Sequence, residues 1–258
     1  MALVYEADLD TRKWLNVKEG SHTYLREGKE IGIYEYNVDT IKERTLTVNC
    51  DGELKDLKEG QDYTAKVLEQ EGKWKKNYYK IKAENFKKEG NYTVILNSKD
   101  NADNSMNNIS LKRKAEPLPL SFTVDRTSPT ILVSGVEDKG KYQSAVKELV
   151  VEVTDNLALE GLDIQIGDRK IHYGKEELKE KNGIVKEQIS KNGNWQKIKV
   201  SATDAAQNIQ QEELRVLVIL TSFQKAKPEN NRVNIIIVIL FLMGLFIWKK
   251  KRGCFILK

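Results

Sequence analysis

The side chains that most often carry catalysis are scarce in this chain. It has only two histidines, His22 and His172. Neither lies near a serine nucleophile elbow or at the His-x-x-x-His spacing of a metal site. Acidic pairs such as Glu176 and Glu177 stand among lysines, as is typical of a solvated surface. We therefore expect no catalytic residue and no enzyme, and assign both histidines structural roles.

Carboxylate-rich turns are a second place where chemistry can occur. Asp100 to Asn104, Asp204 to Asn208 and Asp155–Asn156 offer the oxygen ligands that Ca²⁺ prefers, near a domain junction. The same side chains also form Asx turns, in which a carboxylate accepts hydrogen bonds from its own backbone. We favour the Asx-turn interpretation, and so expect no metal and no cofactor.

Aromatic side chains are a third candidate, because exposed rings can stack on sugars. Trp74, Tyr78 and Tyr79 form one group, and Tyr142 and Trp195 are the others. β-Sandwich cores also need aromatic residues, and Trp195 begins a strand whose pattern points inward. These aromatic residues could therefore either bind a glycan or fill the core of a sandwich, and the sequence leaves both alternatives open.

An apolar segment near the C-terminus predicts a membrane anchor. Residues 233–248 carry no formal charge, and as a helix they would be roughly 24 Å long, a little short of the ~30 Å hydrocarbon core. Long basic side chains at the ends can snorkel to the interface. The apolar side chains of this span include Val233, Ile235, Leu240, Phe241, Leu245 and Trp248.

The charge around this span predicts its orientation. The span is followed by Lys249, Lys250, Lys251 and Arg252. Basic residues beside a span favour the cytoplasmic side, so we expect residues 1–232 outside the cell and 249–258 inside. The whole chain is net +5, and residues 249–258 carry all of it, which leaves 38 basic against 38 acidic residues elsewhere. Such a neutral ectodomain argues against a nucleic-acid partner.

The N-terminus lacks the signal that an exported domain requires. Met1 to Asp10 has no basic stretch followed by an apolar run. We therefore interpret the chain as the C-terminal piece of a longer protein.

Period-2 hydrophobic alternation dominates residues 31–220. It is clear in Ile31–Tyr36, in Thr45–Cys50 with Cys50 facing inward, and in Tyr92–Ser98. Asp51–Gly52 predicts a hairpin turn. Short strands separated by turn signals at intervals of about ten residues indicate β-sandwiches.

An internal repeat divides this region into two related domains. Residues 89–104 and 192–208 both begin with Gly-Asn-aromatic before a strand and close with Asp-x-Ala-x-Asn. The closing residues are Asp100, Ala102, Asn104, Asp204, Ala206 and Asn208. The spacing of the copies, about 104 residues, is one domain length.

The repeated turn and the segment Val124-Asp-Arg-Thr-Ser-Pro129 resemble the tandem bacterial Ig-like domains of Gram-positive surface proteins. That resemblance implies two Ig-like sandwiches joined by a short linker. The chain departs from the family pattern where Asp103 and Gln207 replace the turn glycine. Gln adopts the left-handed backbone region less easily than Asp, so we expect the second turn to be distorted. No Leu-Pro-x-Thr-Gly wall-sorting motif precedes the span, which favours retention in the membrane.

We therefore predict an all-β chain of two tandem Ig-like β-sandwich domains followed by a single C-terminal transmembrane α-helix. Its function would be that of a non-catalytic cell-surface stalk or adhesion protein, with the membrane and an extracellular protein or glycan as partners. The alternative is the accessory region, spacer or carbohydrate-binding, of a surface glycan-degrading enzyme whose catalytic domain lies elsewhere. The predicted segments are an irregular N-terminal piece (1–28), domain 1 (29–126), domain 2 (127–220), a polar tether (221–232), the span (233–248) and a cytoplasmic tail (249–258).

Overall fold

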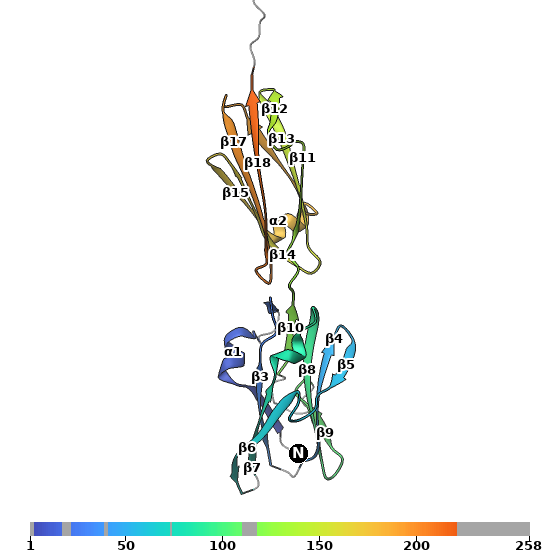
Figure 1. The fold of residues 1–258 in the computed structure, drawn as a ribbon. Helices are drawn as coiled ribbons and strands as arrows, with labels where there is room; N and C mark the ends of the chain where they lie inside the picture. The colour runs from blue at the N-terminus through green and yellow to red at the C-terminus, as the bar shows by residue number, and fades with distance from the viewer. Residues whose placement is uncertain (1–2, 17–21, 39–40, 73, 110–117, 221–258) are drawn as a thin grey trace, which may run out of the picture.

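The computed structural model describes residues 3–16, 22–38, 41–72, 74–109 and 118–220. Within them the chain forms two β-sandwich domains that follow one another along one direction (Figure 1). The predicted tether, span and tail, with the basic cluster from Lys249 to Arg252, lie outside the described residues. Among the described residues, no helix is long and apolar enough to cross a bilayer.

Domain 1 consists of two facing sheets. One has the order β1-β3-β7-β6, and the other has the order β2-β10-β8-β4-β5 with β9 beside β8. Its elements are β1 (Leu3–Ala7), α1 (Leu9–Trp14), β2 (Tyr24–Leu25), β3 (Ile31–Asn37), β4 (Ile41–Cys50), β5 (Glu53–Asp56), β6 (Tyr63–Glu71), β7 (Trp74–Ile81), a 3₁₀ turn η1 (Ala83–Phe86), β8 (Gly90–Asp100), β9 (Ser105–Asn107) and β10 (Leu120–Val124).

Domain 2 has the same plan with a three-stranded sheet, β11-β13-β16, against a five-stranded sheet, β12-β18-β17-β14-β15. Its elements are β11 (Thr130–Ser134), β12 (Gly140–Gln143), β13 (Val146–Thr154), β14 (Leu159–Ile166), β15 (Arg169–Gly174), α2 (Lys175–Glu180), β16 (Ile184–Ser190), β17 (Trp195–Asp204) and β18 (Ile209–Ile219). The Lys- and Glu-rich segment at α2 is a short helix of six residues.

The two strand orders correspond to each other, except that β6 and β9 of domain 1 have no counterpart in domain 2. In both domains the first strand joins one sheet, and a short second strand pairs in parallel with the last strand of the other sheet, as β2 with β10 and β12 with β18. Strands β1, β3, β7 and β6 match the A-B-E-D sheet of an immunoglobulin-like sandwich. The predicted all-β sandwich class is confirmed, and the repeated turn closes β8 and β17 at equivalent positions.

Each domain encloses its own core, built from the inward positions of the alternating strands. In domain 1 the predicted inward residues Cys50, Tyr92, Val94, Leu96 and Ser98 are all buried. In domain 2, Leu149, Val151, Val153, Leu162, Ile164 and Ile166 are buried as well. Burial of each such aliphatic side chain contributes about 1.5–3 kcal/mol, which fixes the strand register.

The interior of domain 1 also holds a buried carboxylate. Glu35 on β3 is fully buried and accepts hydrogen bonds from the Tyr79 hydroxyl at 2.6 Å and from the Arg44 Nε at 2.9 Å. Its second oxygen accepts the Ser98 hydroxyl at 2.6 Å. Because a buried charge is costly without partners, this network satisfies the carboxylate inside the sandwich.

The expectation of an irregular segment over residues 1–28 is wrong for its described part. Strand β1 pairs with β3, and β2 pairs with β10, so the segment contributes one strand to each sheet of domain 1. Helix α1 between them begins at its N-cap Asp8, whose side chain accepts the Thr11 N–H at 2.8 Å. Two- to six-residue elements carry too little periodicity to be recognised in a sequence.

The expected distortion of the second repeat turn is also absent. Asp103 and Gln207 both adopt positive φ, +59° and +68°. The Gln207 N–H donates to the Asp204 carbonyl at 3.1 Å, and the Asp103 N–H donates to the Asp100 carbonyl at the same distance. The backbone hydrogen bonds of the turn therefore hold Gln207 in the left-handed region despite its side chain.

Candidate metal centre

The two domains are joined by a short linker between β10 and β11. Its first residue, Asp125, is hydrogen bonded to both domains: its N–H donates to the Leu25 carbonyl of domain 1 at 2.8 Å, and its carbonyl accepts the Asn208 side-chain amide of domain 2 at 3.0 Å. At the end of the linker, Pro129 restricts its own φ and disfavours a helical Ser128. The linker is thus held in an extended path against domain 2.

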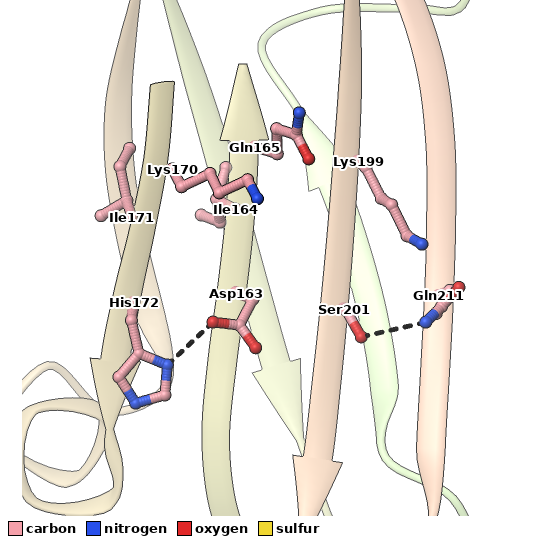
Figure 2. A pocket seen from close by; sticks show the side chains of 9 residues that line it. All are labelled: Asp163, Ile164, Gln165, Lys170, Ile171, His172, Lys199, Ser201 and Gln211. Carbon is pink, nitrogen blue, oxygen red and sulfur yellow. Dashed lines mark hydrogen bonds and ion pairs between the residues drawn. The ribbon is translucent and has the colours of Figure 1, made fainter. Parts of the chain in front are cut away.

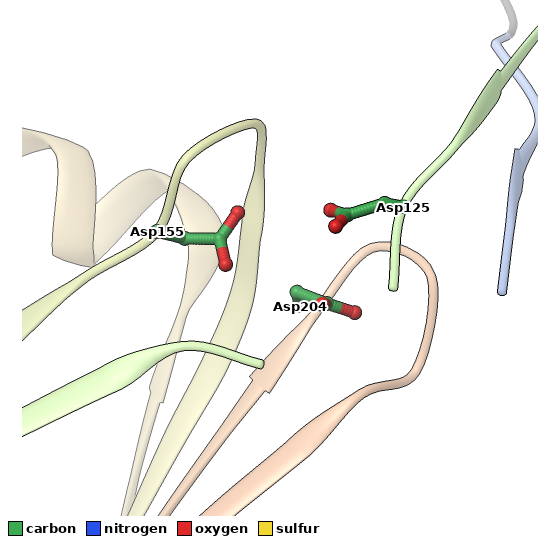
Figure 3. A group of neighbouring side chains, drawn as sticks. All are labelled: Asp125, Asp155 and Asp204. Carbon is green, nitrogen blue, oxygen red and sulfur yellow. The ribbon is translucent and has the colours of Figure 1, made fainter. Parts of the chain in front are cut away.

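Three aspartates meet where this linker reaches domain 2. Figure 3 shows Asp125 from the linker, Asp155 from the loop after β13 and Asp204 from the end of β17. One carboxylate oxygen of each lies within 4.8 Å of the others. Residues separated by up to 79 positions in the chain are therefore brought together by the linker and by the ends of two strands, β13 and β17, that belong to the two different sheets of domain 2.

Asp125 is the most unusual of the three, because it is fully buried. Its Oδ1 accepts the Thr127 N–H at 3.1 Å. Its Oδ2 is buried and has no hydrogen-bond partner. An ionised carboxylate oxygen in such a position is unfavourable unless a cation or a proton satisfies it.

Asp155 shows the same division of its two oxygens. Its Oδ2 accepts the backbone N–H groups of Leu157 at 2.9 Å and Ala158 at 2.8 Å, which is the expected Asx turn. Its Oδ1 is buried without a hydrogen-bond partner.

Asp204 is fully buried, and both of its oxygens bond to Asn208. Oδ1 accepts the Asn208 N–H and Oδ2 accepts the Asn208 side-chain amide, both at 2.7 Å. A carboxylate oxygen has more than one lone pair, so these bonds leave room for a cation.

The electrostatics of the site follow from this crowding. Burial raises the pKa of Asp125 above the usual range of a carboxyl group, and the nearby charges of Asp155, Asp204 and Glu89 raise it further, against the lowering effect of the Thr127 N–H. Like charges that share one site disfavour ionisation, whereas a cation among them reverses that effect.

The donor set fits a hard divalent cation. Carboxylate oxygens suit Ca²⁺ and Mg²⁺, and Ca²⁺ takes ligands at about 2.3–2.6 Å in flexible geometry, so that oxygens on opposite sides of it lie about 5 Å apart. The separations of up to 4.8 Å fit that span. The residues that can hold the ion are Asp125 through Oδ2, Asp155 through Oδ1, and Asp204.

The equivalent turn of domain 1 forms the same hydrogen bonds between carboxylate and backbone, but it has no cluster of carboxylates. Asp100 Oδ1 accepts the N–H groups of Ala102 and Asn104, each at 2.9 Å. In the described part of the chain, Asp125, Asp155 and Asp204 are the only group of metal-ligating side chains this close together. The repeat thus supplies the turn twice, whereas the linker supplies a third carboxylate only at the junction.

Each histidine lies beside one polar side chain. His22 Nε2 lies 2.6 Å from the Thr123 hydroxyl, and His172 Nδ1 lies 2.9 Å from Asp163 Oδ1. His172 lines a shallow pocket of about 410 Å³ on the β15-β14-β17-β18 face (Figure 2). There Asp163 lies between His172 and Ser201 in the strand register, so the histidine and the hydroxyl are two strands, about 9–10 Å, apart at the backbone.

The Asx turns predicted from the sequence are confirmed, but one residue of the aspartate cluster was not predicted. The Asx-turn bonds expected for Asp100, Asp155 and Asp204 are present. Asp125 is not predicted as a site residue from the sequence, where it stands only as part of the linker motif. Its position in the sequence does carry a signal. Asp125 comes directly after a β-strand and before a proline-restricted segment, so it must lie at the junction between the domains, where β17 also ends.

Comparisons with known proteins do not assign the chain to a family. No protein-family model matches it, and no curated protein matches it. Solved structures that resemble it include the fibronectin(III)-like modules of CbhA from Clostridium thermocellum, at 10% identity over 83% of this chain and 94% of that chain with a TM-score of 0.36. The mouse nectin-like molecule 4 ectodomain matches at 13% identity over 84% of this chain and 64% of that chain, with a TM-score of 0.33.

A third structure, the N-terminal Ig1-2 module of the Drosophila receptor protein tyrosine phosphatase DLAR, matches at 12% identity over 76% of this chain and 92% of that chain, with a TM-score of 0.23. All three TM-scores lie below 0.5. The assignment of an Ig-like sandwich to each domain therefore rests on the strand pairings described above.

Proposed function

We propose that the chain is a non-catalytic cell-surface spacer whose inter-domain junction is stiffened by a bound divalent cation of the calcium class. The observation that carries this is Asp125, a fully buried linker residue whose Oδ2 lacks a partner and which lies beside two carboxylates of domain 2. A cation held by all three would fasten the linker to domain 2. Since Asp125 is also bonded to domain 1 through Leu25, the angle between the domains would then be restricted.

Display outside the cell is the second part of the proposal. The apolar run at residues 233–248 and the basic cluster after it support a single membrane anchor with a cytoplasmic tail. The domains would then hold whatever lies beyond them at a defined distance from the bilayer. Protease added to intact cells should degrade residues 30–220, and protection that ends only on lysis would contradict the surface location.

Cation binding is tested on the full chain, which is purified in detergent, stripped of metal with a chelator and then separated from the chelator. Titration with CaCl₂ should release or absorb heat with a stoichiometry of one. At about a hundredfold excess over Kd, binding contributes about 2.7 kcal/mol, enough to raise the Tm of a domain of this size by about 10 °C or more. Ca²⁺ should also slow trypsin cleavage after Arg126 in the linker. No heat, no change in Tm and unchanged cleavage would together overturn the proposal, and MgCl₂ serves as the comparison ion.

A further inference from the structure

The outer face of the β1-β3-β7-β6 sheet in domain 1 carries a group of tyrosines that its fold does not require. Tyr34 on β3 and Tyr78 on β7 lie directly opposite one another, and Tyr36 lies opposite Lys76. All three rings are half-buried and point away from the core, which the alternate positions of the same strands fill. Solvated faces of sheets normally carry polar side chains, so adjacent rings here indicate a surface that binds.

Two of these rings, Tyr34 and Tyr78, line a groove. Its volume is about 810 Å³, and residues of α1, with Leu68 and Lys66 of β6, also line it. The ring centroids of Tyr34 and Tyr78 are 5.1 Å apart, and the Tyr78 hydroxyl donates to Asp8 Oδ2 at 2.7 Å. That bond fixes the Tyr78 ring before any ligand arrives, which reduces the entropic cost of binding.

The groove and the sheet face beside it expose further apolar side chains. Leu68, which lines the groove, is 46% exposed, and Trp74, on the outward side of β7 beyond the groove, is 52% exposed. Tyrosine and tryptophan combine a flat apolar ring with a polar edge, which suits a ligand that has both an apolar face and many hydroxyl groups.

The charges around the groove are mostly paired with one another. Arg12 and Glu6 approach to 3.8 Å, Lys13 and Asp10 to 2.7 Å, and Lys76 and Glu69 to 4.0 Å. Lys76 also lies over the Tyr34 ring, 4.8 Å from its centroid. Paired charges provide hydrogen-bonding groups without a strong field of either sign, and this matches an uncharged ligand better than an acidic or basic one.

We infer that this groove binds a neutral glycan chain, with sugar rings stacked on Tyr34 and Tyr78 and hydroxyl groups bonded to the charged side chains of α1 and Lys66. This binding is independent of the cation at the domain junction. It can be measured with the chelated protein, so failure of one proposal does not decide the other.

The test is calorimetric titration of the full chain in detergent with neutral hexasaccharides of glucose and of N-acetylglucosamine. A hyaluronan hexasaccharide is the anionic comparison. Tyr34→Leu keeps apolar bulk but removes the flat ring, and should weaken binding at least tenfold, about 1.4 kcal/mol. Tyr34→Phe should retain it. Trp195→Ala removes a tryptophan that is 47% exposed on domain 2 and should leave the affinity unchanged.

Three results would overturn the inference. They are no heat with any neutral hexasaccharide, tighter binding of the anionic one, or equal losses in Tyr34→Leu and Trp195→Ala. Each variant is first checked for an unchanged thermal transition of domain 1, so that a loss of affinity reports the ring and not the fold.

Discussion

The side-chain amide of Asn208 donates both to the carbonyl oxygen of Asp125, at 3.0 Å, and to the carboxylate of Asp204, at 2.7 Å. One residue of the repeated turn therefore joins the end of domain 1 to the end of a strand in domain 2. Asn104, its counterpart in domain 1, makes the same bonds within its turn but has no linker to hold.

This pair provides a matched test of the junction. Asn208→Ala should accelerate trypsin cleavage after Arg126 about fivefold, because loss of a buried hydrogen bond removes about 1 kcal/mol from the local stability of the linker. Asn104→Ala should leave that rate unchanged while losing its own turn bonds. Equal rates in the two variants would show that Asn208 does not hold the linker.

Asp125→Asn should change the thermal stability in opposite directions with and without cation. In the folded chain the pKa of Asp125 is raised, mainly by burial. The carboxylate therefore destabilises the metal-free fold above its folded pKa, and this loss is relieved as pH falls toward its unfolded value. At pH 7 in chelator, Asp125→Asn should have the higher Tm.

With CaCl₂ the order should reverse, because the variant lacks one charged ligand. Differential scanning calorimetry in both conditions measures the crossover. Asp168→Asn, at an exposed turn position, serves as the control and should shift neither Tm. A variant that remains less stable than the parent in chelator would contradict the assigned cost of the buried carboxylate.

Gln207→Gly should stabilise domain 2. Gln207 has a φ of +68°, a region that costs a residue with a β-carbon about 1–2 kcal/mol and glycine little. Part of that gain is offset by the greater freedom of glycine in the unfolded chain, so we expect about 1 kcal/mol in urea unfolding. Gln207→Ala keeps the β-carbon and should show no gain.

Glu35→Gln should destabilise domain 1 by about 2–3 kcal/mol, since the partly buried Arg44 guanidinium would lose its charged partner. Glu6→Gln removes a carboxylate from an exposed pair with Arg12 and should cost less than about 0.5 kcal/mol. Urea unfolding followed by tyrosine fluorescence measures both. Similar losses in the two variants would mean that burial of Glu35 adds nothing to the value of its ion pair.

The two cysteines test the membrane topology. Cys50 is a buried free thiol, and Cys254 is expected in the cytoplasmic tail. A membrane-impermeant maleimide should therefore label neither on intact cells, and only Cys254 after permeabilisation. Labelling of Cys254 on intact cells would place the tail outside.

Alternation of large apolar residues made the sandwiches predictable. Side chains such as Val94 and Leu96, or Ile164 and Ile166, alternate along their strands with more polar residues, so they had to face the core. The repeat turn was predictable because it is local in sequence. The cluster of three aspartates was not predictable, because Asp125 meets Asp155 and Asp204 only through tertiary packing. Trp195 was expected inward, yet it is exposed, since Gln196 takes the inward position at the start of β17.

The parallel pairing of an early strand with the last strand has a mechanical consequence. A force that pulls the chain along its length would slide β12 past β18, so that the hydrogen bonds across the pairs from Gly140–Val216 to Gln143–Ile219 would share the load and rupture together. In domain 1 the matching clamp is only two residues long, Tyr24 with Thr123 and Leu25 with Val124. Under tension, domain 1 should yield first and act as the extensible half of the molecule.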